Sequence, residues 1–121
     1  MITGVLIMES LKPDCALDAS GLTFTSISRH DVDGVTTEQP SRWTVAKFTG
    51  DVPDPGELAG RFAEVLDSPG WYVDFHSHDT VWVAFPRRVF TYARGDRDGH
   101  QVAVDYALSV GVPVSQTRWG N

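Results

Sequence analysis

The chain has few of the features that cross-link small proteins or direct them to membranes. Its 121 residues include one cysteine, Cys15, so an internal disulfide is excluded and no second thiol can share a structural zinc ion. No apolar run approaches the roughly 18 residues that span a bilayer, and residues 1–8 lack the basic start and the length of a signal peptide. We therefore expect a cytoplasmic protein, without a membrane partner, that is stabilised by packing.

Positive charge is also scarce. The formal net charge is −6, and the few cations are unevenly placed: residues 1–80 hold five Lys or Arg against thirteen Asp or Glu, whereas residues 81–121 hold five against three. Such a balance argues against a nucleic-acid partner. An acidic protein of this size also fits an inhibitor of a basic protein partner, and its preference for arginine over lysine favours a bacterial origin.

Two segments carry the signals of helix ends. Asp54 is a suitable cap for a first helix, and Glu57 completes a capping box. Asp98 is the expected cap of a second helix, which Gly111 ends. Apolar side chains recur at helical spacing in the first segment: Leu58, Phe62, Val65 and Leu66.

The remaining apolar and β-branched segments predict strands. Three precede the first helix, at residues 2–8, 22–28 and 43–48, with a polar loop at 33–41; a three-stranded meander spans 71–94, with turns at 77–80 and 85–88. The expected fold is one α+β domain over residues 1–121, with a mainly antiparallel sheet of about six strands in the order β-β-β-α-β-β-β-α. Both helices are expected to pack on one face of that sheet.

The register of the first hairpin in the meander decides which side chains are buried. A three-residue loop at 78–80 places the largest apolar set on one face. That face would hold Val73, Phe75, Val81, Val83 and Phe85, and the other would hold Tyr72, Asp74, His76, Trp82 and Ala84. Tyr72, Trp82 and Val89 would then form an open aromatic face, suited to a homodimer or to a small apolar ligand.

The pattern Asp74-x-His76-x-His78 is the strongest candidate for chemistry. Alternate residues of a strand lie roughly 6–7 Å apart on one face, a spacing at which a carboxylate and two imidazoles can share a metal ion. Polar residues on an exposed hairpin produce the same pattern, so we assign no metal and no cofactor. Any metal site should include His76, with Asp74 and His78 as the other candidates.

Two functional hypotheses follow. The leading one is a small binding or interaction module that uses the open aromatic face. The alternative is a small hydrolase, lyase or isomerase, in which His76 acts as general base, Asp74 orients it and Arg88 holds an anion. No nucleophile elbow and no glycine-rich phosphate loop is present, so the sequence assigns no reaction.

Overall fold

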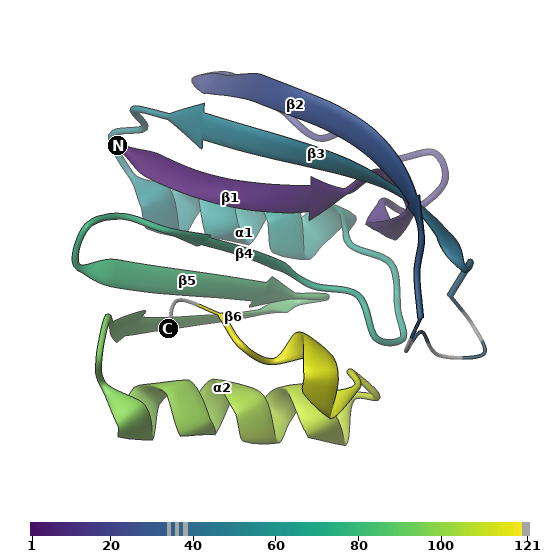
Figure 1. Cartoon of the computed structure of the whole chain (residues 1–121). Coiled ribbons are helices and arrows are strands. Elements are labelled where there is room, and N and C mark those ends of the chain that lie inside the picture. The colour runs from purple at the N-terminus through teal and green to yellow at the C-terminus, as the bar shows by residue number, and fades with distance from the viewer. Residues whose placement is uncertain (34, 36, 38, 120–121) are drawn as a thin grey trace.

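A computed structural model describes residues 1–33, 35, 37 and 39–119. Residues 34, 36 and 38 of the expected polar loop lie outside the described residues. The elements follow the order expected from the sequence (Figure 1). They are β1 (Ile2–Ile7), η1 (Met8–Ser10), β2 (Leu22–Asp31), β3 (Arg42–Gly50), α1 (Pro55–Val65), β4 (Val73–His76), β5 (Thr80–Phe85), β6 (Arg88–Ala93), α2 (Arg97–Ser109) and η2 (Val114–Gln116).

Local capping chemistry determines where both helices begin. The Glu57 backbone N–H donates to Asp54 Oδ1 at 3.1 Å, which confirms the expected cap of α1. The cap of α2 is Asp96 rather than Asp98, because Asp96 Oδ1 accepts from the Gly99 N–H at 3.1 Å and Asp98 lies in the first turn. Neither described helix has the length and apolarity to cross a membrane.

The six strands form one antiparallel sheet in the order β2-β3-β1-β4-β5-β6. The expected α+β class and antiparallel sheet are therefore present. β1 and β4 pair at its centre, where Gly4 lies opposite Phe75. A Cβ atom on Gly4 would lie 2.6 Å from both Phe48 and Phe75. Glycine at this position therefore allows the Phe48 ring and the β4 chain at Phe75 to approach β1 closely.

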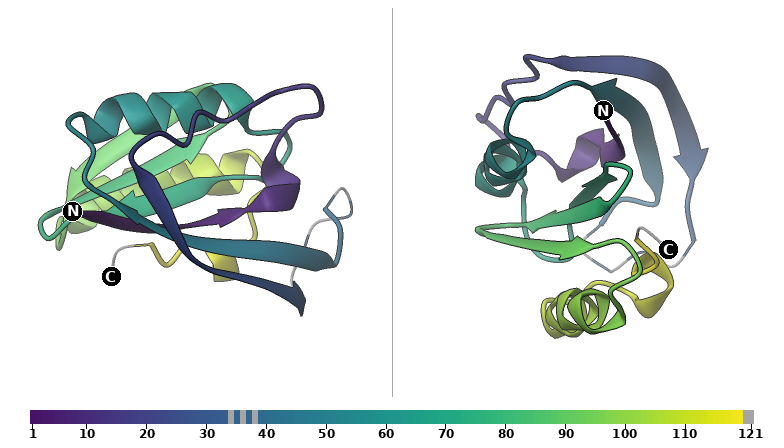
Figure 2. Two further views of the ribbon diagram at one scale, coloured as in Figure 1. Left: turned by 90° about the horizontal axis from the view of Figure 1, so that it is seen from above. Right: turned by 90° about the vertical axis from the view of Figure 1, so that its left-hand side faces the viewer.

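The two helices cover opposite faces of the sheet, so the expectation that both pack on one face is wrong (Figure 2). Leu58 and Phe62 of α1 pack in a cluster that includes Phe75. Ala103 and Ala107 of α2 belong to a separate cluster on the other side. The physical reason lies in β5, whose residues 81–85 are all apolar, as is typical of a strand buried on both faces.

The register of the β4–β5 hairpin also differs from the expected one. His76 pairs with Val81, so Phe75 lies opposite Trp82, one residue away from the expected alignment. Because strand side chains alternate, this shift moves Trp82 to the face of Phe75. The two rings stack with centroids 5.3 Å apart, and Trp82 and Val89 pack against the α1 cluster. The open aromatic face expected from Tyr72, Trp82 and Val89 is therefore absent.

Three phenylalanines form the centre of the α1 side. Phe62 projects from α1 to Phe48 of β3 and Phe75 of β4, with ring centroids 5.8 and 6.0 Å away. All three side chains are fully buried. Their packing ties the first three strands to the last three across the β1–β4 pair.

We predict that Phe62→Ala lowers the free energy of unfolding by about 3–5 kcal/mol, because it leaves a cavity between β3 and β4. Denaturant unfolding measures the loss. Val102→Ala is the matched control, since this α2 side chain is 56% exposed, and it should change stability by less than about 0.5 kcal/mol. A loss below about 1 kcal/mol for Phe62→Ala would contradict the packing described here.

Candidate functional site

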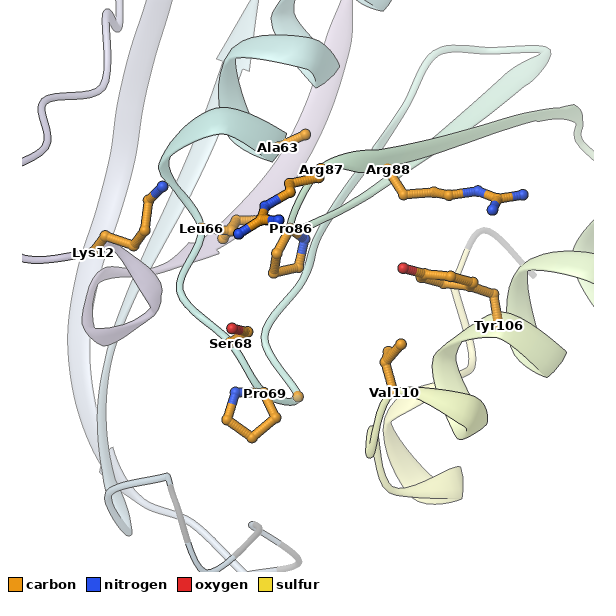
Figure 3. A pocket seen from close by; sticks show the side chains of 11 residues that line it. Lys12, Ala63, Leu66, Ser68, Pro69, Pro86, Arg87, Arg88, Tyr106 and Val110 are labelled. Carbon is orange, nitrogen blue, oxygen red and sulfur yellow. The ribbon is translucent and has the colours of Figure 1, made fainter.

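Two hollows gather the side chains able to carry chemistry. We call the first the cationic pocket; it has a volume of about 570 Å³ and lies between the end of α1, the β5–β6 turn and α2 (Figure 3). Three cations border it from two segments: Lys12 near the N-terminus, and the neighbouring Arg87 and Arg88. Its other lining residues are Ala63, Leu66, Ser68, Pro69, Gly70, Pro86, Tyr106 and Val110.

Backbone contacts with the end of α1 bring these two segments together. The Lys12 N–H donates to the Val65 carbonyl at 2.8 Å, next to an isolated bridge between Leu11 and Leu66. The Arg87 N–H donates to the Ala63 carbonyl at 3.0 Å. Both cations are thereby placed at one end of the helix, although they lie far apart in the sequence.

Aromatic rings position the third cation. The Arg88 guanidinium lies 5.0 Å from the ring centroids of both Phe90 and Tyr106. Contacts of this kind orient an arginine without neutralising it. Arg88 is thus held at the pocket with its hydrogen-bond donors still available.

Arg87 has a backbone conformation that arginine seldom adopts. Pro86 and Arg87 form the two-residue turn between the paired residues Phe85 and Arg88, and the φ angle of Arg87 is +64°. Glycine is the usual residue at the second position of such a turn. A side chain there costs on the order of 1 kcal/mol, and this one is a cation at a pocket.

No carboxylate lines the cationic pocket among the residues that the structure describes. Lys12, Arg87 and Arg88 also form no ion pair with any described carboxylate. Glu64 borders an adjoining hollow that Arg87 and Arg88 also line, and it forms no ion pair with either arginine. A chain of net charge −6 thus leaves three cations unneutralised around one cavity.

We call the second hollow the Asp74 groove. It has a volume of about 450 Å³ and is more open than the cationic pocket. β4 contributes Asp74 and His76, Tyr72 precedes this strand, and Arg94 follows β6. The C-terminal segment completes the lining with Ser115, Gln116, Arg118 and Trp119.

Burial changes the acid–base properties of this groove. It raises the pKa of Asp74 to about 6, because the carboxylate is poorly solvated. Burial, together with the charge of Asp74, also raises the pKa of Tyr72. The pKa of His76 is lowered by burial and by the nearby Arg94. At neutral pH the groove therefore presents a carboxylate beside a neutral imidazole.

The C-terminal segment is anchored over the groove by hydrogen bonds and ring contacts. The Tyr72 hydroxyl donates to the Gln116 carbonyl at 2.9 Å, and the Trp119 ring lies 5.6 Å from that of Tyr72. His100 Nε2 lies 3.0 Å from the Thr117 carbonyl oxygen. These contacts hold Trp119 and Arg118 beside β4.

The structure separates the site residues expected from the sequence. Tyr72, Asp74 and His76 meet in the Asp74 groove, and Arg88 lies in the cationic pocket. His78 lies exposed in the β4–β5 turn. Among the described residues, no three His, Cys, Asp or Glu side chains are close enough to hold a metal ion, so the His76, His78 and Asp74 set is not assembled.

Four charged residues of the two sites were missed by sequence reasoning: Lys12, Arg87, Arg94 and Arg118. Arg87 carries a usable signal, because an arginine follows Pro86 where a turn favours glycine. Lys12 carries none, since its position depends on the contact between Leu11 and Leu66.

We predict that Asp74→Asn stabilises the fold at neutral pH and not at acid pH. Asp74 has a folded pKa of about 6, above the ordinary value of 3.8. The free energy of unfolding therefore loses nothing to Asp74 ionisation below pH 4, where the carboxyl is protonated, and falls as pH rises from there through 6. Relative to wild type, the variant should gain on the order of 2–3 kcal/mol between pH 4 and pH 7.

Denaturant unfolding at a series of pH values measures this difference. Asp33→Asn, which removes an exposed loop carboxylate, should follow wild type within about 0.5 kcal/mol throughout. If the Asp74→Asn difference were constant between pH 4 and pH 7, the carboxylate would not be buried as described.

Comparison with known proteins identifies no relatives. No protein-family model matches the chain, and no curated protein or solved structure matches it. The side chains around the two hollows therefore carry the functional inference.

Proposed function

We propose that the protein binds a small organic anion in the cationic pocket. One observation carries this proposal: Lys12, Arg87 and Arg88 border one cavity from two segments far apart in the sequence, and no described carboxylate lining the cavity or forming an ion pair neutralises them. Unneutralised cations around a concave surface attract anions. The volume of about 570 Å³ lies in the range of small-molecule sites.

The lining indicates the chemistry of the ligand. Two guanidinium groups favour a carboxylate or phosphate head group, which they can bind through paired hydrogen bonds. The hydroxyls of Ser68 and Tyr106 are further polar groups at the pocket (Figure 3). Leu66, Pro69, Pro86 and Val110 supply an apolar wall, which suits an apolar body attached to the anionic head.

The strain at Arg87 supports the same proposal. Glycine would relieve the left-handed conformation at this turn, yet it would remove one of the three cations. Residues held in strained conformations are concentrated at functional sites. Arg87 is thus better explained by ligand binding than by the stability of the turn.

This proposal keeps the binding-module hypothesis and changes its surface. A homodimer or an apolar ligand was argued from an aromatic face, but Trp82 packs against the α1 cluster. The uncovered part of the sheet instead shows Thr3 and Lys47 beside Val5, a mixed surface rather than an apolar patch. Self-association, a protein partner and the enzyme hypothesis for His76 and Asp74 stay untested predictions.

We predict that the protein binds benzoate and inorganic phosphate in isothermal titration calorimetry at low ionic strength, and that it binds benzyl alcohol at least tenfold more weakly. Lys12→Gln and Arg88→Gln should each weaken benzoate binding about tenfold, because each removes a cation from the pocket. Arg97→Gln is the matched control and should leave the affinity unchanged, since Arg97 begins α2 outside the pocket.

Arg87→Gly separates ligand binding from folding. The variant should weaken benzoate binding by a similar factor while raising the free energy of unfolding by roughly 0.5–1 kcal/mol, because glycine relieves the strained turn. Equal binding of benzoate and benzyl alcohol, or equal losses in Arg97→Gln and Arg88→Gln, would exclude the cationic pocket as an anion site.

A further inference from the structure

Asp74 carries a buried carboxylate that no interaction within the described fold stabilises through a side chain. It lies on the central strand β4 and faces the C-terminal segment. Among the described side chains, none donates a hydrogen bond to it or forms an ion pair with it. An apolar residue at this position would avoid the cost of desolvating a charge. An unpaired carboxylate at the wall of a cavity is suited to a cation from outside the chain.

The side chains around Asp74 fit an ammonium group. Tyr72 and Trp119 present aromatic rings to the same groove, and aromatic faces attract organic cations. The Tyr72 hydroxyl is already engaged with the Gln116 carbonyl, so this ring is held in place. A carboxylate and aromatic rings that line the same groove are both groups that attract an ammonium.

The other end of the groove is positively charged. Arg94 lies at this end beside His76, Arg118 borders the groove from the C-terminal segment, and neither forms an ion pair with a described carboxylate. Arg94 is close enough to His76 to lower the pKa of that imidazole, whereas no arginine lowers the pKa of Asp74. The negative and positive ends are therefore separated along β4, with Asp74 at one and His76 and Arg94 at the other.

We infer that the Asp74 groove is a second ligand site, which takes a small zwitterion with its ammonium group against Asp74 and its carboxylate against Arg94 and Arg118. Alternate residues on a strand lie roughly 6–7 Å apart, so the two charged groups of the ligand should be separated by a few bonds rather than by one carbon. An ω-amino acid such as 4-aminobutanoate meets this requirement better than glycine.

Thermal unfolding with added probes tests this site. At about 10 mM, 4-aminobutanoate should raise the melting temperature through preferential binding to the folded state. Butanoate and butylammonium, each with one of the two charges, should give at most a small part of that shift. If no ω-amino acid raised the melting temperature, or if butanoate alone were as effective, a zwitterion site would be excluded.

Variants then assign the binding to this groove. Asp74→Asn should weaken 4-aminobutanoate binding at least tenfold, and Arg94→Gln should weaken it severalfold. Asp33→Asn and Arg97→Gln are the matched controls, because both residues lie outside the groove. Circular dichroism checks that each variant is folded, and Asp74→Asn is expected to stabilise the protein, so lost binding cannot be attributed to unfolding.

The same thermal-shift measurement with 4-aminobutanoate distinguishes the groove from the cationic pocket. Arg88→Gln removes a cation from the pocket and none from the groove, so it should leave 4-aminobutanoate binding unchanged. Binding that depends on Arg88 and survives Asp74→Asn would show that the probe occupies the cationic pocket through its carboxylate. That outcome would overturn the zwitterion site.

Discussion

The stacking of Phe75 on Trp82 fixes the register on which both faces of the sheet depend. With Phe75 opposite Trp82 and Val73 opposite Ala84, one face of β4 and β5 is directed to α1. The alternate residues of both strands are then directed to α2 and the C-terminal segment. A shift by one residue would exchange the two sets, so this hairpin determines what each helix covers.

The same register places the polar side chains of β4. Tyr72, Asp74 and His76 share the face opposite Phe75, where α2 packs over β5 and β6 but not over the whole of β4. The C-terminal segment closes part of the remaining space through Trp119 and the Tyr72 hydrogen bond. Asp74 is therefore surrounded by protein on most sides and still borders a groove. Since α1 packs on the other face of β4, through Phe62 and Phe75, and α2 does not cover Asp74, the central strand can hold a carboxylate that borders a groove.

Much of this fold could be predicted where the signal is local. Asp54 and Glu57 mark the start of α1 within one turn of helix, and the turns of the meander are visible as breaks between apolar runs. The prediction of the sheet face on which Trp82 lies was wrong, because it assumed that the hairpin buries only one face. The unbroken apolar run 81–85 already indicated a strand covered on both sides.

The two candidate sites differ in the same way, because one depends on local sequence and the other on long-range contacts. Asp74, His76 and Tyr72 could be grouped from sequence because alternation along one strand is local. The cationic pocket could not, because it forms where the Leu11–Leu66 bridge and the contact between Arg87 and Ala63 bring distant segments to the end of α1. Its charge also opposes the net charge of −6. Charges beyond about 8 Å are largely screened at physiological ionic strength. An anion at the pocket therefore responds mainly to Lys12, Arg87 and Arg88. For this reason a protein with a negative net charge can still bind an anion.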